Sequence, residues 1–141
     1  MADDRSNLSM GMLANGWYGL TFGILVGLLM RAPGPDAVAP AFAINLCVMA
    51  ALWLGIAIAN PTSRARAYAD IAVATFTFVL VAIALRTEPM FMVPGFLVQA
   101  WWSIQHRSVG YGVIGPVWFL IFASAANLGF AASLLALLTV F

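Results

Sequence analysis

The chain has 141 residues, of which 64% are hydrophobic and 8% are charged, against roughly 45–50% apolar and 25% charged residues in a soluble domain. This composition excludes an ordinary water-soluble domain and predicts an all-α, polytopic membrane protein that forms one helical domain in the lipid bilayer. The net charge is +1 and the positive side chains are scattered arginines, so no surface for binding nucleic acid is expected.

The first apolar segment, residues 11–30, carries glycines in steps of four, at Gly19, Gly23 and Gly27. Membrane helices associate where small residues let their backbones approach closely, and this spacing places the three glycines on one ridge. We therefore expect the ridge to be a helix-packing face. The acidic residues at the start of the chain are not typical of a signal peptide, so this helix is expected to be retained.

The second apolar segment, residues 37–59, follows a short turn rich in Pro and Gly. It has its own small residues in steps of four, at Ala43, Cys47, Ala51 and Gly55. Because the turn is short, we expect the first two segments to pair as antiparallel helices with their small ridges in contact. A single cysteine cannot form an internal disulfide or a cysteine metal cluster, so Cys47 is expected to be a packing residue.

Residues 64–85 and 114–140 are predicted to be two further membrane-spanning helices, the latter with Pro116 in its first turn. The segment between them, residues 89–106, is harder to assign because its apolar part is short for a ~30 Å hydrocarbon core. It is predicted to be a fifth span. The alternative is four spans, with this segment lying at the interface or re-entering the membrane.

Charged and aromatic residues favour the five-span model. One side of the membrane then carries four arginines: Arg5, Arg64, Arg66 and Arg107. The other side carries two arginines, each near an acid, so the positive-inside rule places the N-terminus in the cytoplasm, as in a bacterial inner membrane or its equivalent. The Trp and Tyr residues, Tyr111 among them, all fall toward the cytoplasmic ends of their segments.

Four amide side chains are expected inside the membrane, at Asn15, Asn45, Gln99 and Asn127. Polar side chains at such positions are costly enough to be candidates for function. Gln99 and Asn127 fall near the midplane on neighbouring antiparallel helices, where a hydrogen bond between them would hold the helices together. The functional alternative is that the amides line a narrow polar path for a neutral solute.

Two ionisable residues have the same two interpretations, structural and functional. Asp70 is the one acid that can enter the membrane, and with Arg66 one turn before it near a helix start it fits a position stabilised by the helix dipole. Its functional alternative is a counter-charge for a bound solute. His106, the only histidine, fits a cap at a helix C-terminus. No other residue points to haem or chlorophyll, so no cofactor is assigned.

The most unusual local composition surrounds Trp102. By the i, i+3, i+4, i+7 rule, Gln99, Trp102, Ser103 and His106 share one helix face. Tryptophan near a membrane surface is typical of a lipid anchor. The alternative is an aromatic pocket in the cytoplasmic half, between the first, fourth and fifth segments. Other helices would then contribute Trp17, Trp53 and Trp118 to this pocket.

No paired acids, phosphate-binding glycine loop or Ser/His/Asp set indicates an enzyme, so no catalytic residue or metal ligand is predicted. Two functions remain: an oligomeric channel or carrier for a small neutral or cationic solute, and a non-catalytic accessory subunit that packs on partner membrane subunits through its Gly and Ala ridges. The candidate ligand-binding or pore residues are Asn15, Trp17, Trp53, Asp70, Gln99, Trp102, Ser103, His106, Trp118 and Asn127.

Overall fold

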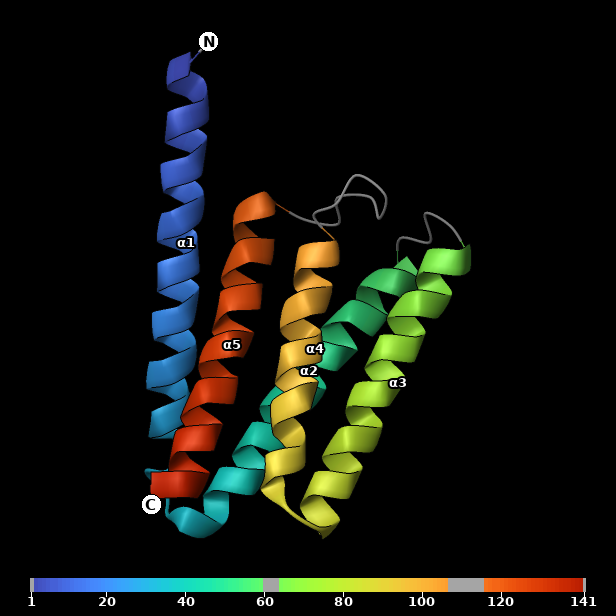
Figure 1. The fold of residues 1–141 in the computed structure, drawn as a ribbon. Helices are drawn as coiled ribbons and strands as arrows, with labels where there is room; N and C mark the ends of the chain where they lie inside the picture. The colour runs from blue at the N-terminus through green and yellow to red at the C-terminus, as the bar shows by residue number, and fades with distance from the viewer. Residues whose placement is uncertain (1, 60–63, 107–115, 141) are drawn as a thin grey trace.

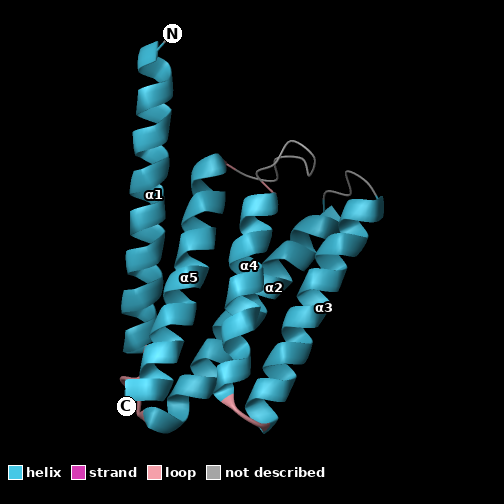
Figure 2. Ribbon diagram, viewed as in Figure 1, coloured by secondary structure: helices cyan, strands magenta, loops and turns pink. Residues whose placement is uncertain are grey.

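The computed structural model describes residues 2–59, 64–106 and 116–140, and these are helical apart from short turns (Figure 2). The helices are α1 (Ala2–Leu29), α2 (Val38–Ala59), α3 (Arg64–Arg86), α4 (Met92–Gln105) and α5 (Val117–Val140). Two 3-10 turns, η1 (Pro35–Ala37) and η2 (Pro89–Phe91), precede α2 and α4. Consecutive helices run in opposite directions, so α1 begins and α5 ends at opposite ends of the bundle (Figure 1).

Most helix ends lie close to the predicted ones, with two differences. α1 begins at Ala2 rather than near residue 11, and the predicted fourth helix is divided into η2 and the shorter α4. Pro116 lies immediately before α5, where its missing N–H leaves no helical hydrogen bond unmade. Arg107, Tyr111 and residues 114–115 lie outside the described residues.

In the described part of the chain, four segments are long and apolar enough to cross a membrane: Met10–Leu29, Pro35–Ile56, Arg64–Arg86 and Val117–Val140. They fit a multi-pass membrane protein. α4 is not among them, because its 14 residues extend only about 21 Å at 1.5 Å per residue. By length and composition, four of the described segments are candidate membrane spans. The predicted fifth span, residues 89–106, is not confirmed by these two criteria.

The glycine ridge of α1 faces α5, and the prediction that it pairs with the small ridge of α2 is wrong. A Cβ atom added at Gly19 would meet the carbonyl group of Phe122, and one added at Gly23 would meet that of Ala126. Gly129 of α5 lies equally close to α1. α5 thus presents small residues and bare backbone to the ridge, which lets the two helices approach closely.

The small residues of α2 do not form one packing face. Ala43 is buried in the core and Cys47 is half-buried against it. Ala51 and Gly55 are exposed, and nothing lies within 4 Å of a Cβ atom added at Gly55. α2 packs mainly against α3 instead of α1, so the regular spacing of its small residues does not correspond to a helix contact.

α5 is the central helix of the bundle, with α1 on one side and α4 on the other (Figure 1). Three phenylalanine rings, Phe42 of α2, Phe96 of α4 and Phe130 of α5, contact one another with centroid separations of 5.7–6.4 Å. This aromatic core joins three helices in the half of the bundle where α4 begins. The opposite half, where α4 ends, contains a cluster of buried polar side chains.

Candidate functional site

Asp70 is buried at the contact between α3 and α4, two turns into α3. Its side chain is 4% exposed, and the buried residues of α3 recur every three or four positions: Asp70, Ala74, Thr77, Val81 and Ala84. This spacing places the carboxylate on the seam that packs against the bundle. The structure therefore has Asp70 facing the interior of the bundle, in contact with Trp102 and His106.

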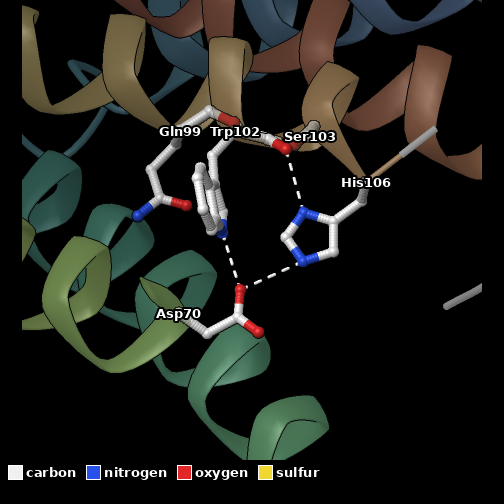
Figure 3. Close-up of polar contacts among 5 residues, drawn as sticks. All are labelled: Asp70, Gln99, Trp102, Ser103 and His106. Atoms are coloured by element: carbon white, nitrogen blue, oxygen red, sulfur yellow. Dashed lines mark hydrogen bonds and ion pairs between the residues drawn. The ribbon is translucent and has the colours of Figure 1, made fainter. Parts of the chain in front are cut away.

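Two nitrogen atoms from α4 converge on a single carboxylate oxygen. The indole Nε1 of Trp102 donates a hydrogen bond to Oδ1 of Asp70 at 2.8 Å, and Nε2 of His106 lies 3.0 Å from the same oxygen (Figure 3). The other ring nitrogen of His106, Nδ1, lies 2.9 Å from the backbone carbonyl oxygen of Trp102. Because Trp102 and His106 are one helical turn apart, both can reach one residue on α3.

Aromatic rings enclose the His106 imidazole. The indole of Trp53, from α2, stacks on it with a centroid separation of 4.3 Å and an interplanar angle of 22°. The Trp102 ring meets it edge-on at 5.2 Å. His106 and Trp53 are each 1% exposed. The Asp70–His106 pair is therefore buried among side chains of α2, α3 and α4, where electrostatic interactions are stronger than in water.

A second polar layer lies two helical turns farther along the same seam. Nε2 of Gln99 donates to Oγ1 of Thr77 at 2.9 Å, and the Thr77 hydroxyl donates to the carbonyl of Val73 at 2.9 Å. Since the single hydroxyl proton is used on Val73, Thr77 can only accept from Gln99. This fixes the orientation of the amide and leaves its oxygen, Oε1, buried without a hydrogen-bond partner.

The predicted hydrogen bond between Gln99 and Asn127 is wrong. Nδ2 of Asn127 donates instead to the carbonyl of Ala123, one turn earlier on its own helix, and Oδ1 of Asn127 has no partner. An amide can satisfy itself on a neighbouring residue or on its own helix, so the sequence positions of two amides do not determine that they pair. Both side chains are fully buried, and both present an unmet acceptor to the interior.

The other predicted site residues have different surroundings. Ser103 is buried and donates to the carbonyl of Gln99 at 2.8 Å. Trp17 and Trp118 are 67% and 54% exposed, and neither joins the cluster. Asn15 is half-buried on α1, which lies across α5 from the other polar residues. The polar residues therefore do not gather between the first, fourth and fifth helices: Trp102 and His106 meet Asp70 of α3 and Trp53 of α2 instead.

A groove does lie between α1 and α5, bordered by Ile104 of α4, with a volume of about 710 Å³. Trp17 lines it, and Ser124 is the one hydroxyl-bearing residue that does so among the residues described. Asn15, Gln99 and Asn127 are not among its lining residues. An apolar groove of this kind offers no set of polar groups for recognising a polar solute.

Sequence reasoning missed Thr77, although it lies seven residues after Asp70 and so shares its helix face. Two more buried nitrogen atoms lack partners, Nδ2 of Asn45 and Nε1 of Trp53. Asp70 and His106 are not joined by a third His, Cys, Asp or Glu in a group that would suit a metal ion, as far as the described residues extend. The polar cluster thus consists of the Asp70–His106 pair and the indoles of Trp53 and Trp102, with the Gln99–Thr77 hydrogen bond as a second layer.

Comparison with known proteins gives no family to which this cluster can be referred. No family model, characterised protein or solved structure matches the chain.

Proposed function

We propose that the protein is a membrane carrier for a small cationic or N–H-bearing solute, recognised at the cluster formed by Asp70, Trp102 and His106. The observation that carries this proposal is the burial of a carboxylate–imidazole pair among apolar helices. Such a pair is costly to desolvate and is weak evidence for stability, whereas ionisable residues inside membrane segments typically mark solute or proton pathways. A helical scaffold alone has no need for it.

The surroundings of Asp70 suit a cation. The carboxylate supplies negative charge, and the faces of Trp53 and Trp102 suit a cation held over aromatic rings, each such contact contributing roughly 0.5–2 kcal/mol. The unmet oxygen of Gln99, one turn from Trp102, is an acceptor for an N–H donor. The side chains of the cluster are buried, which favours a carrier with an occluded site over an open channel.

The alternative function, an accessory subunit, has less support. The α1 glycine ridge is covered by α5, so in this fold it is not available to a partner subunit. The exposed small residues of α2, Ala51 and Gly55, remain available, but a stripe of small residues alone does not identify a partner.

We also propose that η2 and α4 cross the membrane as a fifth span. Figure 1 supports this, because α4 runs alongside α5 and α3 within the bundle instead of across its end. Residues 89–106 extend about 27 Å at 1.5 Å per residue, close to the ~30 Å core. Arg64 then lies on the side of the N-terminus and Arg86 on the opposite side, and the positive-inside rule places the N-terminus in the cytoplasm.

This topology predicts that the C-terminus faces away from the cytoplasm. Alkaline phosphatase fused after residue 141 should be active in the periplasm of a bacterial host, and green fluorescent protein fused at the same point should not fluoresce. Fusions after residue 88 serve as the control, because that turn is non-cytoplasmic in both the five-span and the four-span models. A cytoplasmic C-terminus would contradict the fifth span.

The transport proposal is tested with purified protein in liposomes and radiolabelled methylammonium as the probe. We expect Asp70→Asn and Trp102→Ala each to reduce the initial uptake rate roughly tenfold, as for the loss of about 1.4 kcal/mol of recognition. Trp118→Ala is the matched control, because it removes an equally large but exposed ring outside the cluster. It should keep the uptake rate within about twofold of the wild-type value.

Only folded variants are compared, as judged by circular dichroism and gel filtration in detergent. Uptake by the wild-type protein no faster than into empty liposomes would contradict a carrier for this class of solute. Equal losses in the Trp102 and Trp118 variants would remove the cluster as the site.

A further inference from the structure

The contacts of His106 suit a ring that carries a proton on each nitrogen. Both ring nitrogens face oxygen acceptors, Nε2 at 3.0 Å from Asp70 Oδ1 and Nδ1 at 2.9 Å from the Trp102 carbonyl. A neutral imidazole has only one N–H, so beside an ionised carboxylate one of these contacts would set a nitrogen lone pair against an oxygen lone pair. An imidazolium donates from both nitrogens and satisfies both contacts.

The other neighbours agree with a protonated ring. Oδ1 of Asp70 also accepts from the Trp102 indole, and two donors on one oxygen are typical of an ionised carboxylate. The Trp53 face lies 4.3 Å from the imidazole centroid, within the distance at which an indole attracts a cation. The pair is then electrically neutral, with one positive and one negative charge.

We propose that this proton is exchangeable, and that a small monovalent organic cation competes with it for the negative charge of Asp70. When His106 loses its proton, the buried Asp70 carboxylate loses the positive partner at His106 Nε2, which an apolar interior disfavours strongly. An ammonium-type cation restores a positive partner, with the Asp70 carboxylate as the acceptor for its N–H groups. The inference that a cation competes with the proton rests on the proposed carrier function. The inference that His106 is protonated does not depend on that function.

Few other charges act on this pair in the described part of the chain. On α3 itself, Arg66 lies one turn before Asp70, and Arg64 and Tyr68 are exposed. α4 and α5 contain no other ionisable residue over Met92–Gln105 and Val117–Val140, and α2 contains only Cys47, which packs in the Phe42 core. The Asp70–His106 pair is therefore the proton-binding group of this enclosure.

The protonated pair is tested by nuclear magnetic resonance. His106 is the only histidine, so labelling with [15N]histidine gives the signals of this one ring in the full-length protein in detergent. At pH 7 we expect both ring nitrogens to show imidazolium chemical shifts. The shifts of a neutral tautomer in the wild-type protein would overturn the protonated pair.

The competition is tested by calorimetry with methylammonium chloride as the probe. Titrations in two buffers of different ionisation enthalpy should show about one proton released per cation bound, and the apparent Kd should rise about tenfold per unit fall in pH. In His106→Gln, which keeps a hydrogen-bonding side chain but no exchangeable charge, the proton release on addition of methylammonium should be lost. No binding to the wild type, or binding without proton release, would overturn the competition.

The two proposals fail in distinguishable ways. Methylammonium uptake into liposomes without proton release keeps the carrier and overturns the competition. An imidazolium signal in a protein that neither binds nor transports methylammonium overturns both the carrier and the competition for this class of solute, and leaves a protonated structural pair.

Discussion

Replacing Asp70 with leucine is expected to lower the free energy of unfolding by about 3–5 kcal/mol, as for breaking a buried ion pair by removing one partner. The leucine leaves the Trp102 indole N–H and the Nε2 position of His106 without an acceptor in an apolar enclosure. Each unmet buried group costs roughly 1–3 kcal/mol. Asp36→Leu, at an exposed acid in η1, is the control and should change stability little.

The double variant Asp70→Leu with His106→Leu provides the sharper measurement. Removing both partners of a buried pair is less damaging than leaving one uncompensated. The loss in the double variant should therefore be smaller than the sum of the two single losses by about 1–3 kcal/mol, the coupling typical of residues in one network. Thermal or denaturant unfolding in a fixed detergent measures all three. Strictly additive losses would show that the two side chains do not interact in the folded protein.

Replacing Gly23 with alanine should cost about 2 kcal/mol or more, at the upper part of the range for overpacking a close contact. The added Cβ atom would overlap the carbonyl group of Ala126 and approach Cα of Gly129. These are backbone atoms, which cannot move aside by changing a rotamer, so the helices α1 and α5 must separate. A lower unfolding temperature in detergent is the expected result.

Gly16→Ala is the matched control for this variant, because the chemical change and the helix are the same. A Cβ atom at Gly16 lies 3.8 Å from a side-chain methyl of Ile121, an ordinary van der Waals distance. Any effect of alanine on helix propensity, about 1 kcal/mol in water, applies at both sites and cancels in the comparison. Equal stability of the two variants would contradict the close approach of α1 to α5.

The polar face of α4 was predictable because helical periodicity is local. The spacing of Gln99, Trp102, Ser103 and His106 places them on one side of a helix whatever surrounds it, and all four are buried in the structure. The apolar composition likewise predicted helices long and apolar enough to cross a membrane, as the described residues have, since a backbone in lipid must satisfy its hydrogen bonds internally. The spacing of the α1 glycines is local in the same way: it predicts that they share one face of the helix, whichever helix covers that face.

Which surfaces meet is a property of the whole bundle and was decided only by the tertiary structure. The short turn before α2 brings the ends of α1 and α2 together, but α5, the last helix of the chain, covers the glycines, because it offers small residues at matching intervals. With α5 between α1 and α4, the polar face of α4 meets α2 and α3 instead. Asp70 then becomes the partner of Trp102 and His106 across 32 residues or more of sequence. No local pattern encodes that distance: helix periodicity fixes the face a residue occupies, and packing among all the helices selects the neighbour.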